Sequence, residues 1–224
     1  MPTKKLAEKD YYGYVEKFLK NRFDCFVTAQ NRGTKFGRVD VVGIRDIGGE
    51  HKGDTEVIGV EVKGGNQPFN TATGQAYGYS VYADRCYLAD VRDGARPFTL
   101  EEIDIASKLG VGLLAIRPKG SVTEILTSPK HVPLVHMRVQ LINKLGYSEC
   151  MICGSAFERG DDDNWNKYVS RAIKNAVKQE KGFVYWLFDI DARKRSLSSR
   201  KYVYDRRYVC AECIKNLYSE FVSE

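Results

Sequence analysis

The sequence predicts an α/β protein, in which one mixed sheet carries helices on its faces and a smaller cysteine-rich part follows. Six short, apolar, strand-like runs lie between residues 25 and 126, and helical patterns precede, separate and follow them. Two closely spaced pairs of cysteines come later, from Cys150 onward. At 224 residues the chain can bury roughly 70% of its unfolded surface, which suffices for one large domain with an appendage.

The first predicted element is an amphipathic helix over residues 6–23. Apolar side chains recur there at helical spacings, namely Tyr11, Tyr12, Val15, Phe18, Leu19 and Phe23. A helix with one apolar face packs that face on a sheet.

The strand-like runs are rich in apolar and β-branched residues. They cover residues 25–29, 38–44, 56–63, 85–91, 112–116 and 122–126. Gly and Asp in the segment GGEHKGD predict a hairpin between the second and third runs.

Helices are predicted between and after these strands. Residues 68–83 read as helical despite their glycines, and residues 101–110 form a second helix that ends at Gly110. A third helix, over residues 133–146, leads into the cysteine-rich part. We therefore predict two domains, residues 1–130 and residues 131–224.

The composition is that of a soluble globular protein, with 43% hydrophobic and 29% charged residues. No apolar run approaches the roughly 20 residues that span a bilayer, so we expect no membrane association. The opening residues, MPTKKLAEKD, lack the apolar segment of a secretory signal. We expect a cytoplasmic location, where disulfides are rare.

Positive charge is concentrated near the C-terminus. The chain has a net charge of +6, and residues 165–208 contain 12 Lys or Arg against 4 Asp or Glu, a net of +8. Such a concentration favours a polyanionic partner, of which nucleic acid is the usual one, although basic segments are often only solvated surface.

Glu61 and Lys63 interrupt an apolar strand on one of its two faces. Asp40 lies in the preceding strand, and pairing of the two strands could bring its carboxylate near Glu61. Two adjacent carboxylates repel unless they share a cation, and their hard oxygens suit Mg²⁺, or Mn²⁺ in its place. Lys63 could orient or deprotonate a metal-bound water, or stabilise charge on a phosphate.

Asp40 followed by Glu61-Val62-Lys63 resembles the motif of the PD-(D/E)xK phosphodiesterase superfamily, the restriction-endonuclease-like fold. The resemblance extends over about residues 6–127 in the order of helices and strands. By this resemblance Glu16 on the first helix and Gln75 on the helix after the third strand would join the site. Valine stands before Asp40, where the motif's name has proline.

The resemblance implies a metal-dependent DNA endonuclease that hydrolyses phosphodiester bonds, in restriction, junction resolution or repair. The other function left open is an inactive module that binds DNA or protein. Cutting both strands commonly needs two sites, so a homodimer stays open beside a monomer. Glu61 and Lys63 could also be an ion pair at a sheet edge, and Glu16 and Gln75 could be ordinary surface residues.

Four cysteines form the paired motifs Cys150-x-x-Cys153 and Cys210-x-x-Cys213. Four thiolates at such spacings suit a tetrahedral structural Zn²⁺ site. A loop bearing the first motif and a helix opened by the second resemble a treble-clef zinc finger. The isolated Cys25 and Cys86 lie in strand patterns and are expected in the core.

A helix predicted from Trp165 carries one basic stripe. Its members fall at spacings of 4, 3 and 4, namely Lys167, Arg171, Lys174 and Lys178. The stripe could follow DNA phosphates or could be a solvated helix face.

Overall fold

The computed structural model describes residues 7–34, 37–48, 54–94, 97–118, 120–150 and 152–158, together with Cys210, Cys213 and Asn216. The chain divides into two compact units. The first contains Met1–Asp46 and Glu56–Leu141, and the second contains Ile47–Thr55 and Ile142–Glu224. The sequence predicts the domain boundary near residue 130, whereas the boundary between the two compact units lies after Leu141. The second unit also contains Ile47–Thr55, the segment between the second and third strands.

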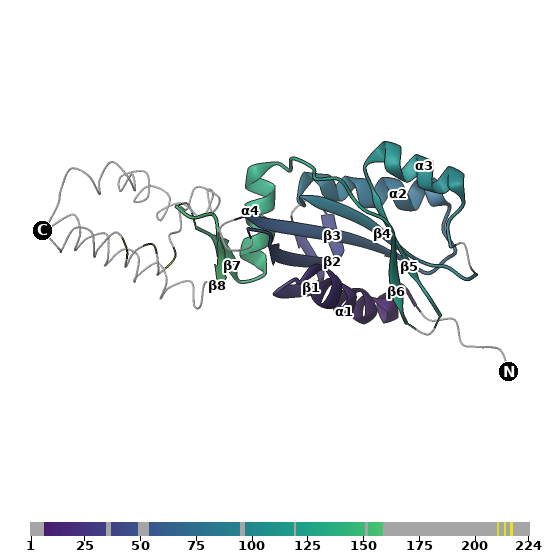
Figure 1. Cartoon of the computed structure of the whole chain (residues 1–224), viewed down its shortest axis with the longest axis horizontal. Helices are drawn as coiled ribbons and strands as arrows, with labels where there is room; N and C mark the ends of the chain where they lie inside the picture. Colours follow the sequence, from purple (N-terminus) through teal and green to yellow (C-terminus); the bar gives the residue numbers. More distant parts are fainter. Residues whose placement is uncertain are drawn as a thin grey trace, which may run out of the picture. The chain divides into compact units, whose positions relative to one another are not determined.

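A six-stranded mixed sheet forms the centre of the first unit (Figure 1). Its strands neighbour one another in chain order: β1 (Val27–Thr34), β2 (Gly37–Asp46), β3 (Thr55–Lys63), β4 (Arg85–Val91), β5 (Gly112–Ile116) and β6 (Val122–Leu126). The pairs β1–β2 and β5–β6 are antiparallel, and β3, β4 and β5 are parallel. The predicted class, a mixed sheet flanked by helices, is confirmed.

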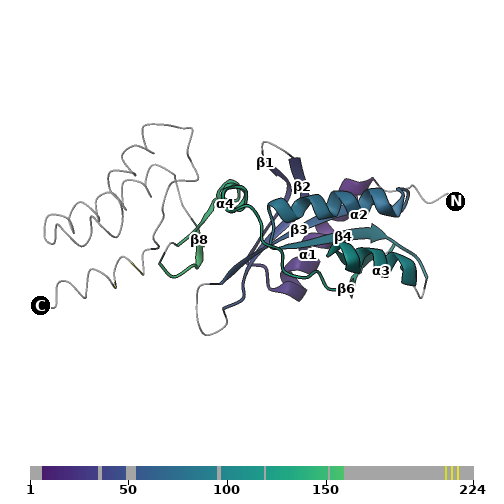
Figure 2. The same cartoon turned by 90° about the horizontal axis from the view of Figure 1, so that it is seen from above.

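Helices cover both faces of this sheet (Figures 1 and 2). The 3₁₀ turn η1 (Glu8–Tyr11) and α1 (Tyr12–Phe23) lie on one face, and α2 (Phe69–Gly78), η2 (Tyr79–Val81) and α3 (Leu100–Leu109) lie on the other. The helix predicted over residues 68–83 is thus divided, and its last turn tightens into η2.

Two apolar layers hold the helices on the sheet. Val15 and Leu19 of α1 are fully buried in one apolar cluster with Ile58 and Val60 of β3. On the opposite face, Ala76 of α2 packs in a cluster with Leu88 and Ala106. Because β3 contributes to the core along its whole length, all nine of its residues are buried. Cys25 and Cys86 are buried, which confirms their prediction as core residues.

In the second unit, a short hairpin carries the first cysteine motif. The strands β7 (Tyr147–Glu149) and β8 (Ala156–Glu158) are antiparallel, and the motif lies between them. The helix α4 (Val135–Lys144) crosses the division between the units and corresponds to the helix predicted over residues 133–146. In the described ranges of the chain, no helix has the length and apolarity needed to cross a bilayer.

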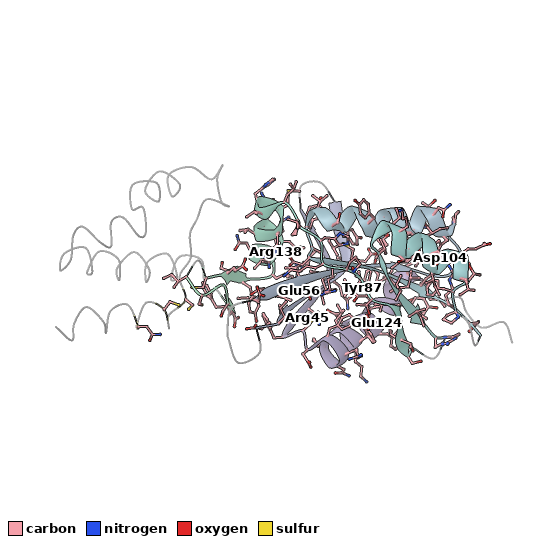
Figure 3. All side chains as sticks on the ribbon, turned by 45° about the horizontal axis from the view of Figure 1, so that its top comes forward. Arg45, Glu56, Tyr87, Asp104, Glu124 and Arg138 are labelled. Carbon is pink, nitrogen blue, oxygen red and sulfur yellow. The ribbon has the colours of Figure 1, made fainter. Side chains whose placement is uncertain are left out.

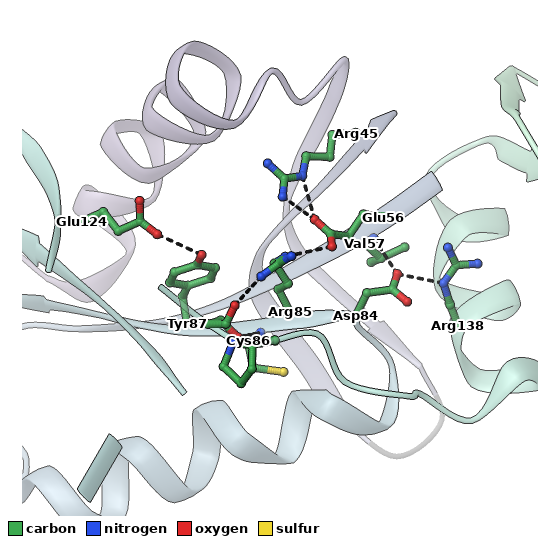
Figure 4. Close-up of polar contacts among 11 residues, drawn as sticks. Arg45, Glu56, Val57, Asp84, Arg85, Cys86, Tyr87, Glu124 and Arg138 are labelled. Carbon is green, nitrogen blue, oxygen red and sulfur yellow. Dashed lines mark hydrogen bonds and ion pairs between the residues drawn. The ribbon is translucent and has the colours of Figure 1, made fainter. Parts of the chain in front are cut away.

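A polar network begins at the first residues of β3. Figure 3 locates Arg45, Glu56 and Tyr87 on the ribbon, and Figure 4 shows the contacts. Glu56 is fully buried and accepts from Arg45 Nε at 2.7 Å and from Arg85 Nε at 2.8 Å. Arg85 also donates to the carbonyl of Ser128. A buried carboxylate needs such partners because desolvation of an unpaired charge is costly.

Removal of the Glu56 carboxylate is expected to destabilise the protein. The Glu56→Ala variant leaves Arg45 and Arg85 without their shared anion, and we expect a loss of about 3 kcal/mol in the free energy of unfolding. Urea denaturation would measure it. Glu101→Ala, at an exposed position of α3, is the control and should change stability by about 0.5 kcal/mol or less. Equal effects of the two variants would contradict a structural role for Glu56.

Candidate active site

Glu61 and Lys63 form a buried ion pair on strand β3. Lys63 Nζ lies 2.6 Å from Glu61 Oε1, and each side chain is 7% exposed. The strand β3 has β2 and β4 as neighbours, so the pair is not at an edge of the sheet. The alternative of an edge ion pair is therefore wrong in its location. Two charged side chains in an interior strand are costly to bury, and here each charge is compensated by the other.

Asp40 of β2 reaches the same place. Its Oδ2 accepts a hydrogen bond of 2.9 Å from the backbone nitrogen of Val62, the residue between Glu61 and Lys63. Its Oδ1 accepts one of 2.8 Å from the hydroxyl of Tyr12 at the start of α1. The structure thus brings Asp40, Glu61 and Lys63 together, as the sequence motif predicts.

Tyr79 is a site residue that sequence reasoning missed. Its hydroxyl donates to Glu61 Oε2, and the carbonyl oxygen of Arg38 lies 3.0 Å from the same hydroxyl. Gly59 makes this approach possible, because a Cβ there would lie 3.3 Å from Tyr79 Cβ. An aromatic residue at the end of an apolar helix predicts a core position, so the sequence offered no signal for this contact.

The turn after Lys63 is held by a buried carboxylate on the next strand. Gly65 has a φ of 78°, and a Cβ at this position would lie 2.7 Å from the carbonyl oxygen of Val91. Its nitrogen donates to Asp90 Oδ1 at 2.8 Å, and Asp90 also pairs with Arg92. Glycine is required at this turn because other residues rarely adopt a positive φ.

The surroundings favour a charged lysine and a carboxyl group that ionises reluctantly. Burial raises the pKa of Glu61, and the Asp40 charge adds to this, while hydrogen bonds to Lys63 and Tyr79 oppose it. Burial lowers the pKa of Lys63, but its contact with Glu61 outweighs this and raises the pKa overall. A raised Glu61 pKa means that this group's contribution to stability is largest below pH 4.5 and falls as the pH rises from 4.5 to the folded-state pKa.

Both tyrosines remain protonated donors. Burial raises the pKa of Tyr79, with the Glu61 charge and hydrogen bond as further causes. Burial likewise raises the pKa of Tyr12, assisted by its hydrogen bond to Asp40. Each hydroxyl therefore holds one carboxylate in place across the physiological pH range.

The two remaining predicted site residues lie elsewhere on the helices. Glu16 accepts a hydrogen bond of 2.6 Å from Gln30 Nε2 of β1, and Gln75 is exposed on α2. Glu8 lies near Lys63, because its Cγ is 3.7 Å from the position of a Cβ built on the adjacent Gly64. Its charge contributes to the raised pKa of Lys63. Catalytic roles for Glu16 and Gln75 stay predictions.

The carboxylates of Asp40 and Glu61 are suitable ligands for a hard cation. Asp40 and Glu61 supply two carboxylates, and Mg²⁺ commonly uses one or two carboxylates with waters in its remaining positions. Among the residues that the structure describes, these two carboxylates belong to no group of three or more possible metal ligands. Any ion held here would therefore depend on water or substrate oxygens for most of its ligands.

The four paired cysteines meet in the second unit. The sulfur atoms of Cys150, Cys153, Cys210 and Cys213 all lie within 4.8 Å of one another. Cys153 Sγ and Cys210 Sγ are 3.8 Å apart, which matches the separation of about 3.8 Å between sulfurs bound tetrahedrally at about 2.3 Å from Zn²⁺. These cysteines could therefore bind a metal ion such as zinc.

The local backbone helps to bring these thiols together. Gly154, with a φ of 72°, turns the chain after Cys153 and donates its N–H to the carbonyl of Cys150 at 2.8 Å. The nitrogen of Cys210 donates to Cys150 Sγ at 3.3 Å. Burial would raise the pKa of Cys153, but hydrogen bonds from Ser155 and the neighbouring thiols outweigh it and lower the pKa to about 7.

The thiols of Cys210 and Cys213 resist ionisation without a cation, because burial raises the pKa of each. Burial raises the pKa of Cys213, and its contacts with Cys210 and Cys153 raise it further. Clustered thiolates repel one another, and a bound divalent ion removes that repulsion. Cys213 and Asn216 have helical backbone, in keeping with a helix at the second motif.

The predicted basic stripe of Lys167, Arg171, Lys174 and Lys178 lies outside the described residues. Its role in DNA binding stays a prediction.

Comparison with known proteins does not assign a family. No protein-family model and no curated protein matches the chain. One similar solved structure is that of a protein of unknown function from Silicibacter pomeroyi, with 18% identity and a TM-score of 0.42. The match covers 79% of this chain and 95% of that chain. At this level the similarity assigns neither a fold family nor a function.

Removal of the lysine is expected to raise the pKa of Glu61 further. In Lys63→Met the ammonium that favours the Glu61 carboxylate is lost, while the burial persists. Carbon NMR of the Glu side-chain carboxyl groups would follow the titration, with Glu61 assigned from the Glu61→Gln variant. Lys108→Met, at an exposed position of α3, should leave the titration of Glu61 unchanged. A pKa that stays constant or falls in Lys63→Met would contradict the pairing.

Metal binding by the four cysteines gives a further prediction. The full chain should bind one Co²⁺ in a tetrahedral sulfur site, with thiolate-to-cobalt charge-transfer absorption that one equivalent of Zn²⁺ abolishes. The variant Cys153→Ser should lose the tetrahedral four-sulfur spectrum. Cys86→Ser changes a buried thiol of the first unit and is the matched control, with an unchanged spectrum. Loss of the signal in both variants would point to unfolding rather than to ligation.

Proposed function

We propose that this chain is a metal-dependent DNA endonuclease of the PD-(D/E)xK type, with a zinc-bound C-terminal part that helps to bind DNA. The observation that carries the proposal is the hydrogen bond from Val62 N to Asp40, because it places the Asp40 carboxylate against the backbone between Glu61 and Lys63. The burial of Glu61 and Lys63 and the raised pKa of Glu61 support it, since perturbed titratable groups are enriched at functional sites.

The side chains of the site have separable roles in this proposal. Asp40 and Glu61 would hold Mg²⁺ or Mn²⁺, which would supply an acidic bound water and offset charge on the phosphate. Lys63 keeps its proton beside Glu61 and would orient the attacking water or stabilise the developing phosphate charge. Tyr12 and Tyr79 fix the two carboxylates through their hydroxyls.

The cysteine cluster has a structural role in this proposal. Four thiolates would occupy every position of a tetrahedral Zn²⁺, which leaves none for a reacting water. The hairpin of β7 and β8, with helical backbone at Cys213, suits a treble-clef-like arrangement. The basic residues that follow Trp165 in the sequence are the proposed DNA contacts of this part.

A second candidate is a catalytically inactive module that binds DNA or protein. One observation favours it: both oxygens of Asp40 and both oxygens of Glu61 already contact donors of the protein. Lys63 occupies the place of a cation beside Glu61. A carboxylate still has further lone pairs for a metal ion, so this observation does not exclude the enzyme.

Cleavage assays separate the two candidates. Supercoiled plasmid DNA and a panel of duplex, branched and single-stranded DNAs would be incubated with the full chain and either Mg²⁺ or Mn²⁺. The enzyme should cut only with the divalent ion, and Asp40→Asn, Glu61→Gln and Lys63→Met should each lower the rate by about 100-fold or more.

Matched controls decide what a loss of cutting means. Glu101→Gln and Lys108→Met change the same residue types at exposed positions of α3 and should cut like the parent. Retained cutting in Glu61→Gln would reveal a contaminating nuclease and remove support for the enzyme. Binding of DNA across the panel, with no cutting in either metal ion, would establish the inactive module.

A further inference from the structure

The paired ends of β1 and β2 (Figure 2) carry Arg32 and Arg38, close in the sequence to Asp40 of the candidate active site. We call residues 31–34 and 37–39 the β1–β2 ribbon. No Asp or Glu occurs from Cys25 to Val39 in the sequence. Arg32 and Arg38 are both exposed, and neither takes part in an ion pair with another described residue. This ribbon therefore presents positive charge that the described part of the protein leaves unneutralised.

The register places the two arginines on opposite faces of the ribbon. Arg32 is the partner of Val39, and Arg38 is the partner of Gly33. Partners in neighbouring strands share a face, and successive rungs alternate between faces. Arg32 and Arg38 occupy successive rungs, so one basic side chain projects from each side.

Glycines keep the ribbon thin. A Cβ on Gly33 would lie 2.6 Å from Arg38 Cγ and 2.8 Å from the carbonyl oxygen of Gly37. The aliphatic stem of Arg38 therefore crosses the space above Gly33, where a side chain would collide with it. Both arginine side chains remain exposed on this strand pair, of which β1 is the edge strand of the sheet and β2 also neighbours β3.

The ribbon is continuous with the catalytic strand. Arg38 precedes Asp40 by two residues, about 6.8 Å along an antiparallel strand. Tyr79 links the ribbon to the active site, because its hydroxyl contacts Glu61 and lies 3.0 Å from the Arg38 carbonyl oxygen. A ligand held by Arg38 would consequently lie near the carboxylates.

We propose that the β1–β2 ribbon enters the major groove of duplex DNA, where Arg32 and Arg38 contact phosphates of the two strands that flank the groove. The major groove is about 12 Å wide and admits a two-stranded ribbon. A basic side chain on each face of the ribbon matches the two phosphate walls. The inference rests on the proposed function in that DNA is the substrate, and it assigns the element that orients the duplex over Asp40.

The same geometry disfavours duplex RNA. The major groove of A-form RNA is deep and narrow, and side chains cannot read it. A ribbon that needs the wide groove of B-form DNA should therefore distinguish the two duplexes. A solvated hairpin without a nucleic-acid role would show no such preference.

Equilibrium binding of a fluorescent DNA duplex to the full chain, without added divalent ion, tests the ribbon. Arg32→Gln and Arg38→Gln should each weaken binding about tenfold, as loss of one charge-assisted phosphate contact does. Each should also reduce the slope of log K against log salt by about 0.9, and the double variant by about 1.8. Arg22→Gln, exposed at the far end of α1, is the control and should match the parent in both quantities.

Protection of guanines from methylation tests whether the ribbon lies in the major groove. Dimethyl sulfate methylates guanine N7, which lies in the major groove. The parent should protect guanines in the bound duplex, and the double variant Arg32→Gln/Arg38→Gln should lose that protection at a protein concentration that restores full binding. Protection that persists unchanged in the double variant would overturn the placement in the major groove.

The outcomes separate this inference from the proposed nuclease activity. If Arg32→Gln, Arg38→Gln and Arg22→Gln all have the same affinity and salt slope, the proposed DNA-binding role of the ribbon is wrong, even if the parent cuts DNA through Glu61. Ribbon-dependent binding without cutting in Mg²⁺ or Mn²⁺ would retain the ribbon and refute the endonuclease. Equally tight binding of duplex RNA by the same residues would overturn the choice of B-form DNA.

Discussion

The contact on which the rest of the site depends is the buried ion pair between Glu61 and Lys63. An interior strand with apolar neighbours penalises both charges, and each is retained only because the other lies 2.6 Å away. The hydroxyl of Tyr79 adds a third partner. Because Asp40 is tied to the backbone between the two charged residues, movement of β2 relative to β3 would disturb all three side chains together.

The fold supplies this arrangement through the positions of its helices. The start of α1 brings Tyr12 to Asp40, and the residues after α2 bring Tyr79 to Glu61. These helices cover opposite faces of the sheet, so the carboxylates are held from both sides. The Glu56 network at the other end of β3 is a separate polar anchor, and the two networks together explain how one buried strand accommodates three charged side chains.

The cysteine cluster is independent of this chemistry. Its sulfur spacing suits a tetrahedral ion, and its two halves lie 57 residues apart in the sequence, between Cys153 and Cys210. A ligand set closed by four thiolates stabilises a fold and leaves no position for catalysis. The chain thus combines a candidate reaction centre with a cluster of cysteines that could bind a metal ion, and each can be tested by changes at its own residues.

Local periodicity in the sequence determined strands β2 to β6, the helices and the mixed α/β class, because alternation and helical spacing depend only on neighbouring residues. It placed the first strand at residues 25–29, whereas β1 extends to Thr34, and it did not predict β7 or β8. The residue types also marked Asp40, Glu61, Lys63 and the four cysteines as candidates, because charged residues stand out in apolar strands and Cys-x-x-Cys is a short motif. Tertiary structure alone decided that Tyr12, Tyr79 and Glu8 approach the site and that Glu16 pairs with Gln30. Contacts between residues 18 to 28 positions apart, such as Tyr79 with Glu61 and Tyr12 with Asp40, depend on how helices cross the sheet, which no local pattern encodes.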